Sequence, residues 1–153
     1  MLAVSEDGRR FTKRVTVVEP DGVHEYYMTD PAVIILDGAW YMYVTGKSKA
    51  KLPNLGIIVY TSADGIAWRR AGVTAIPMGA PGSYDAKYIE GCEVHQEGRE
   101  LVSLYTCCSN DDIWSIAMAR GTDPLKPFSK VDRNPVFECS PAGWDGGGVA
   151  VPL

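Results

Sequence analysis

The sequence lacks the features that mark membrane-spanning, secreted and nucleic-acid-binding chains. Its 153 residues contain no apolar run near the roughly 18 to 20 residues of a membrane span. The N-terminal stretch soon turns polar, so we expect a cytoplasmic chain, with secretion open only if an upstream segment is missing. A net charge of −4 and a pI near 5.1, without a cluster of basic and aromatic residues, argue against nucleic acid as a partner.

Histidine and cysteine are also scarce, with 2 His and 4 Cys. Cys107 and Cys108 are adjacent, so on a strand their side chains would point to opposite faces and would not readily share one metal ion. A chain of this length and apolar content does not need a disulfide framework. We therefore expect mostly buried free thiols, with no metal and no cofactor.

Helical periodicity is absent, because no stretch of about 11 residues repeats its apolar positions at the helical spacing. The chain instead has 16 Gly, 10 Pro, 8 Tyr and 4 Trp, a composition typical of short strands joined by tight turns. The pattern predicts one all-β domain that is large enough for a core. We expect strands at residues 32–36, 40–46, 57–61, 92–95, 101–106 and 114–119.

Two motifs recur at similar spacing. Ser-x-Asp-Gly at 5–8 returns at 62–65, and Asp30-Pro31 is followed sixty residues later by Glu90-Gly91. A period of about 60 residues with four short strands is typical of a β-propeller blade. We predict blades at 30–72 and 90–132, the outer hairpin of a preceding blade at 1–18, and the start of a further blade at 144–153.

These units are too few for a ring, which needs at least about four blades. The sequence therefore predicts part of a β-propeller, with about two full blades of four antiparallel strands and a partial blade at each end. A cut ring exposes unpaired strand edges, which proteins usually cover. We therefore expect a homo-oligomer in which the open edges of two copies meet.

Asp30 and Glu90 are the most suggestive acids. The innermost strands of a propeller line its axis, so acids at the starts of successive innermost strands should face one another. Two carboxylates across a polar cleft suit glycoside hydrolysis, in which one donates a proton and the other works ionised. A single acid before a strand is also ordinary turn chemistry. Candidate sugar-binding residues are Tyr27, Tyr88, His95, Trp144 and Asp145.

Other aromatic and basic residues have a simpler structural interpretation. Tyr41, Tyr43, Tyr60, Trp40, Trp68 and Trp114 recur where blades need aromatic packing, which favours core over sugar contact. Residues 47–54 are expected to form a polar loop. Its lysines, Lys47, Lys49 and Lys51, are most simply solvated, although one of them could reach an acidic sugar.

The order of these motifs resembles the five-bladed β-propeller glycosidases of glycoside hydrolase families 43 and 32. The resemblance covers nearly the whole chain. It rests on Thr-Asp-Pro at 29–31, Asp-Gly-x-Trp-Tyr-x-Tyr-x-Thr-Gly at 37–46 and Thr-Ser-x-Asp-Gly-x-x-Trp at 61–68. It implies a carbohydrate partner, namely furanosides or β-linked pentosides and hexosides. In the families' set of three acids, it makes Glu90 the general acid and Asp30 the supporting acid.

That set of acids is incomplete here. If Asp30 is the supporting acid, the first-blade Asp lies outside the chain. If Asp30 is instead the first acid, Glu90 stands where the supporting Asp should be, and the third position holds Gly147, two residues from Asp145. We therefore expect the isolated chain to be inactive. Two alternatives remain: a non-catalytic carbohydrate-binding or assembly module, and a propeller related to mannoside phosphorylases that takes its phosphate-binding arginines from outside this chain.

Overall fold

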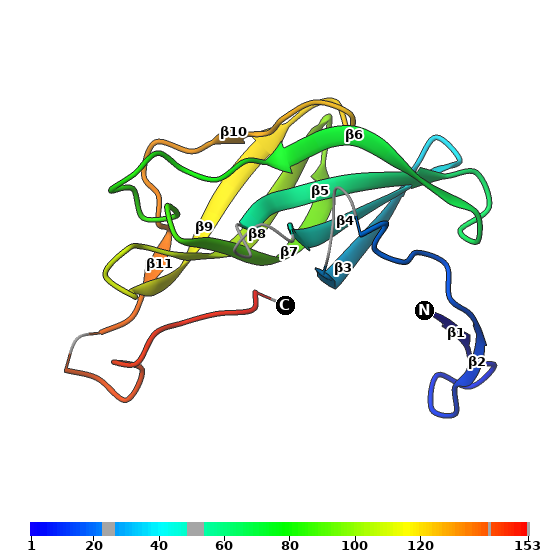
Figure 1. Ribbon diagram of the computed structural model, residues 1–153, viewed down its shortest axis with the longest axis horizontal. Coiled ribbons are helices and arrows are strands. Elements are labelled where there is room, and N and C mark those ends of the chain that lie inside the picture. Colours follow the sequence, from blue (N-terminus) through cyan, green and yellow to red (C-terminus); the bar gives the residue numbers. More distant parts are fainter. Residues whose placement is uncertain (23–26, 49–53, 141, 153) are drawn as a thin grey trace.

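The computed structural model describes residues 1–22, 27–48, 54–140 and 142–152, and these contain strands and turns but no helix. No helix in that part of the chain is therefore a candidate for crossing a membrane. The strands form two large antiparallel sheets and one separate hairpin (Figure 1). This arrangement confirms the all-β prediction.

The first sheet is a four-stranded meander. Its strands are β3 (Tyr27–Leu36), β4 (Ala39–Lys47), β5 (Asn54–Ser62) and β6 (Trp68–Ile76), paired in the order β3-β4-β5-β6. The turn between β3 and β4 consists of Asp37 and Gly38, with φ angles of 50° and 80°. Two consecutive residues with positive φ are what a two-residue hairpin turn requires, and Asp-Gly suits it well.

The second sheet repeats this plan. Its strands are β7 (Tyr88–Glu97), β8 (Glu100–Cys108), β9 (Trp114–Gly121) and β10 (Ser129–Lys130), and β11 (Phe137–Glu138) also pairs with β9. The two sheets lie side by side, with β3 next to β7 (Figure 1). The first sheet has four antiparallel strands, and the second has four in the same order plus the short β11, so the predicted fold class is confirmed.

A separate hairpin, β1 (Leu2–Val4) and β2 (Thr12–Val15), projects away from the blades (Figure 1). Its turn is built like the turn between β5 and β6. Oδ1 of Asp7 accepts hydrogen bonds from the backbone N–H groups of Arg9 and Arg10, both at 2.8 Å. Oδ1 of Asp64 accepts the equivalent pair from Ile66 and Ala67, also at 2.8 Å. The recurring Ser-x-Asp-Gly motif therefore encodes one turn geometry.

The main core lies between the two blades. Tyr43, Ile57, Val59, Ile89 and Tyr105 are among its fully buried side chains. The Tyr43 ring lies 5.7 Å from the Phe128 ring, between centroids. Tyr43 and Tyr60 are buried, so their assignment to the core is confirmed.

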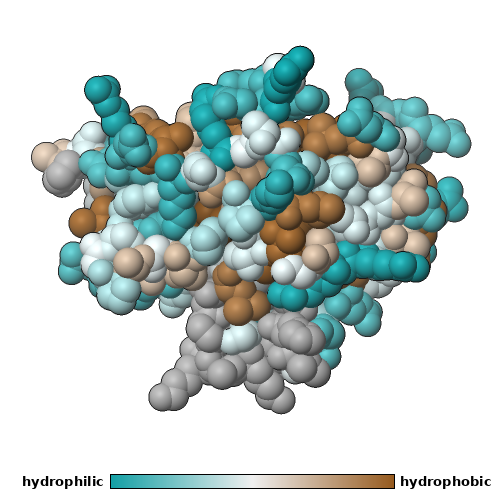
Figure 2. Space-filling model, turned by 90° about the horizontal axis from the view of Figure 1, so that it is seen from above, coloured by the Kyte–Doolittle hydropathy of each residue, from teal (hydrophilic) through white to brown (hydrophobic). Residues whose placement is uncertain are grey.

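A smaller apolar cluster lies on the other face of the first blade. It is formed by Met42, Val44, Ile58 and Tyr60, with Val18 and Trp68 packed against it. The face of the molecule in Figure 2 is mostly polar, with apolar side chains in separate patches.

The thiols are free, as expected. Cys92, Cys107 and Cys108 are buried, and Cys139 is half-buried. Burial raises the pKa of the Cys92 and Cys107 thiols to about 12. These cysteines therefore pack as small apolar side chains in their protonated form.

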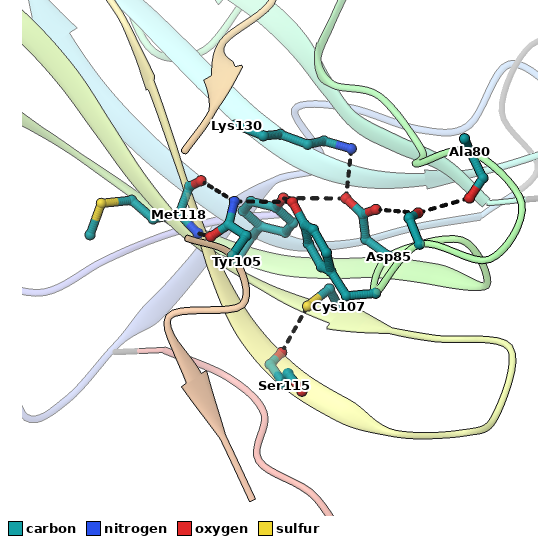
Figure 3. A network of polar contacts seen from close by, with 10 residues as sticks. Ala80, Asp85, Tyr105, Cys107, Ser115, Met118 and Lys130 are labelled. Carbon is teal, nitrogen blue, oxygen red and sulfur yellow. Dashed lines mark hydrogen bonds and ion pairs between the residues drawn. The ribbon is translucent and has the colours of Figure 1, made fainter. Parts of the chain in front are cut away.

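A buried polar network fastens the linker between the blades to the second blade (Figure 3). Asp85, which is 1% exposed, lies 2.6 Å from Lys130 Nζ and accepts hydrogen bonds from the hydroxyls of Tyr105 and Ser83. A Cβ atom at position 79 would overlap the Asp85 carboxylate, so only glycine fits there. The linker therefore has a fixed position against β8 and β10.

Candidate functional site

The two predicted acids lie at corresponding bulges of adjacent inner strands, one residue out of register with each other. Each strand is irregular there: the register of β3 shifts between Thr29 and Ala32, and that of β7 between Glu90 and Cys92. Bulges of this kind bend a strand and re-aim its side chains. The two bulges correspond, but with a spacing of 61 residues and not the predicted sixty: Glu90 is the last paired residue before its bulge, as Thr29 is, and Gly91 is the counterpart of Asp30.

The backbone repeats a second unusual feature at these points. Asp30, Gly91 and Val151 have φ angles of 53°, 46° and 58°. They lie 61 and 60 residues apart along the chain, which matches the blade period. Positive φ is rare outside glycine and costs on the order of 1–3 kcal/mol, so a valine there is a marked outlier. The sequence spacing predicts Gly147 at the third start, whereas the repeated backbone geometry places it at Val151.

These three residues meet around one pocket of about 180 Å³. The other lining residues are Pro31, Cys92, Glu93 and Pro152. The C-terminal segment returns to this place from beneath the second blade (Figure 1), and the backbone N–H of Val151 donates to Oγ1 of Thr106 at 2.8 Å. The pocket therefore holds Asp30 and Glu93 as carboxylates and an apolar residue at the third start.

Glu90 is turned toward the first blade, where its Oε1 lies 2.6 Å from Nζ of Lys47. The two side chains are 29% and 20% exposed, respectively. Thr45 of β4 holds the next residue of β7, because its Oγ1 accepts a hydrogen bond from the backbone N–H of Gly91 at 2.9 Å. The end of β4 thus holds the acid-bearing bulge of β7 through one neutral and one charged contact.

The expected start of the polar loop at Lys47 is wrong. Lys47 is the last residue of β4 and pairs with Tyr27 of β3, so the polar loop does not begin there. The reason is that a lysine at a strand end can extend from the sheet toward a partner on the next blade. The predictions for Lys49 and Lys51 lie outside the described residues.

An aromatic group surrounds this ion pair. Lys47 Nζ lies 5.8 Å from the ring centroid of Tyr27 and 5.5 Å from that of Tyr88. The Tyr88 ring stacks on Trp114, with centroids 5.9 Å apart and planes 9° apart. Lys87 Nζ lies 5.7 Å from the Tyr88 centroid and forms an ion pair with Asp112. Tyr27 is 51% exposed and so offers an open face.

The structure thus brings Tyr27 and Tyr88 to the Lys47–Glu90 pair. It adds Trp114, which was expected to pack in the core, and Lys47, which was expected to be solvated but is paired and only 20% exposed. The alternation of side chains between the two faces of β4 could have identified Lys47 as a neighbour of the second blade. Thr45 and Lys47 are two residues apart on one strand, so they share a face.

The remaining predicted ligand residues lie elsewhere. His95 is five residues beyond Glu90 on β7, roughly 17 Å away at the rise of a strand, and pairs with Glu97 at 3.0 Å. The Trp144 side chain is 100% exposed. Asp145 Oδ2 accepts a hydrogen bond from the Ser140 backbone N–H at 3.2 Å, within a C-terminal turn. None of these three lines the pocket described above.

Comparisons with known proteins identify the architecture. No family model and no curated protein matches the sequence. Among solved structures, the chain is similar to Zg3597, a family 117 glycoside hydrolase of the marine bacterium Zobellia galactanivorans, with a TM-score of 0.75 and 21% identity over 89% of this chain and 42% of that one. The fold is that of the β-propeller glycosidases.

Two further propeller glycosidases have the same likeness. CoXyl43, a family 43 β-xylosidase/α-arabinofuranosidase from a compost metagenome, has a TM-score of 0.62 and 18% identity over 78% of this chain and 38% of that one. A GH43_1 enzyme from Xanthomonas citri has a TM-score of 0.61 and 20% identity over 73% of this chain and 34% of that one. The chain spans less than half the length of these propellers.

Proposed function

We propose that this chain is the saccharide-binding part of a glycoside-hydrolase-like propeller, with Glu90 as general acid and Asp30 as supporting acid. The observation that supports this most is that adjacent inner strands bulge at the same point, with Asp30 inside one bulge and Glu90 directly before the other. The solved structure of CoXyl43, a similar fold, is a complex with xylotriose. Tyr27 and Tyr88 supply the aromatic surface on which a sugar ring would stack.

The isolated chain is inactive in this proposal, because the third position of the repeat does not carry an acid to join Asp30 and Glu90. The third position of the repeat is Val151, which has no titratable side chain. Glu90 is also paired with Lys47, whereas a general acid must carry a proton when it protonates the leaving oxygen. Catalysis would need both a further carboxylate and the release of Glu90 from its lysine.

The missing parts come, in this proposal, from further blades supplied by a second copy or by more of the same protein. Residues 1–18 would belong to the outer hairpin of a preceding blade, and residues 144–153 would begin a further one. The hairpin β1–β2 supports this, because it stands apart from the blades (Figure 1) and leaves Phe11 and Val15 exposed. Exposed apolar residues on a short hairpin are suited to contact with another sheet.

The test has a binding arm and a turnover arm. Calorimetry with xylotriose is expected to show binding to the chain and weaker binding to Tyr88→Ala. Aryl arabinofuranosides, xylosides and fructosides are expected to show no turnover. If one of them does turn over, Glu90→Gln should abolish it, whereas Glu97→Gln, at the far end of the same strand, should not. Failure of every saccharide to bind would reject the proposal, and turnover that survives Glu90→Gln would remove Glu90 from the acid role.

A non-catalytic carbohydrate-binding module is the second candidate. The Lys47–Glu90 ion pair favours it, because Glu90, the proposed general acid, is already bound to the Lys47 ammonium in the unliganded chain. An experiment that joins the chain to blades carrying the missing acids distinguishes the two candidate functions. An enzyme part would then gain Glu90-dependent turnover, whereas a binding module would bind sugar and remain inactive.

A further inference from the structure

Four described charged side chains near Tyr88 form two ion pairs, and this arrangement suggests the chemical class of the ligand. The ammonium groups of Lys47 and Lys87 both lie within 6 Å of the Tyr88 ring centroid, at 5.5 and 5.7 Å. Among the residues that the structure describes, Lys47 is paired with the carboxylate of Glu90 and Lys87 with that of Asp112. The four side chains therefore sum to no net charge as long as Glu90 is ionised.

This balance changes if Glu90 acts as the acid proposed above. A protonated Glu90 leaves Lys47 without this anionic partner, although the ammonium still lies near two aromatic rings and the side chain is 20% exposed. A partly buried ammonium that loses its counter-ion is unfavourable, and a charge-assisted hydrogen bond to another anion relieves that cost. An anion on the ligand can supply this bond.

We propose that the site selects saccharides with an anionic substituent, either a carboxylate or a sulfate ester, and that Lys47 is the residue that binds it. The sugar ring lies against the exposed face of Tyr27, its anionic group replaces the Glu90 carboxylate as the partner of Lys47, and Glu90 is freed to take up a proton. This inference rests on the proposed function, since it assumes a saccharide at Glu90.

The experiment compares matched ligands by calorimetry at low salt: methyl glucoside, methyl glucuronide and methyl glucoside 6-sulfate. The full chain is tested beside Lys47→Met, which keeps the length of the side chain and removes its charge. Lys126→Met, at a lysine that is 75% exposed and pairs with Asp123 on the outer part of the second blade, is the control. Glu90→Gln is the second variant, because it removes the competing carboxylate while keeping the shape of the side chain.

We expect at least one anionic glycoside to bind about tenfold or more tightly than methyl glucoside, in keeping with one charge-assisted hydrogen bond. Lys47→Met should remove that preference, Lys126→Met should leave it, and Glu90→Gln should increase it. The carboxylate and sulfate arms identify which anion is preferred.

Other outcomes separate the two proposals. Equal binding of neutral and anionic glycosides, or a preference that survives in Lys47→Met, overturns the selection of anionic saccharides and leaves the proposed function intact. A preference that falls in Glu90→Gln also overturns it, because removing a competing anion should strengthen binding. If none of these glycosides binds and xylotriose does not bind either, both proposals fail.

Discussion

Replacing Lys130 with methionine should destabilise the fold strongly. The Lys130 ammonium lies 2.6 Å from Asp85 Oδ2, and Asp85 is 1% exposed. At an effective dielectric constant near 20, Coulomb's law gives a gross attraction of about 6 kcal/mol at this separation, much of it offset by desolvation. Removing the lysine leaves a buried carboxylate without its cation, which costs about 3–5 kcal/mol. That is a large fraction of the total stability of a domain, about 5–15 kcal/mol.

Urea unfolding followed by tryptophan fluorescence measures this loss. With a slope of about 2 kcal/mol per M, the midpoint should fall by about 2 M in Lys130→Met. Lys126→Met, which breaks an exposed pair, should cost less than about 1 kcal/mol. Adding Asp85→Asn to Lys130→Met should restore stability, because the buried charge is then gone. Equal losses in the two lysine variants, or additive losses in the double variant, would refute the reasoning.

Three further predictions concern acid stability, thiol reactivity and assembly. Hydrogen bonds from the backbone N–H groups of Ala67 and Ile66 lower the pKa of Asp64 below 3.8. The stabilisation by ionised Asp64 is therefore present above pH 3.8 and is lost as the pH falls through the folded-state pKa. The difference in melting temperature between the unchanged chain and Asp64→Ala should shrink in acid, and a constant difference would contradict this. Because burial raises the pKa of Cys92 to about 12, a thiol reagent should modify Cys139 first, and equal rates in the native chain would exclude a buried Cys92. Light scattering should show an oligomer, and a stable monomer would count against edge-to-edge assembly.

Local sequence patterns predicted the strands and their turns. Asp37-Gly38 adopts the two-residue turn that this dipeptide favours, and Asp64 forms the same loop as its counterpart 57 residues earlier, Asp7. Such features depend on neighbouring residues, so they can be read without a structure. The spacing also predicted that the start of β3 recurs in β7, because blades repeat a whole structural unit. It missed the register by one residue, since the counterpart of Asp30 is Gly91 and not Glu90.

Features set by packing between distant segments could not be predicted in this way. Lys47 pairs with Glu90, 43 positions later, only because β4 lies against β7. Asp85 lies in a turn-rich linker, where a buried ion pair leaves no pattern in the sequence. The prediction for His95 failed for the opposite reason. His95 is only five residues from Glu90 in the sequence, but an extended strand places the two residues far apart.

The central claim is that the starts of the inner strands form a saccharide site. Titration of the isotopically labelled chain with xylotriose and with methyl glucuronide, followed by NMR chemical-shift mapping, tests it most directly. We predict that the largest shifts fall on the backbone amides of Gly91, Thr106 and Lys47 and on the Trp114 indole. Shifts confined to the outer turns, such as residues 62–68, or no shifts with either sugar, would contradict it.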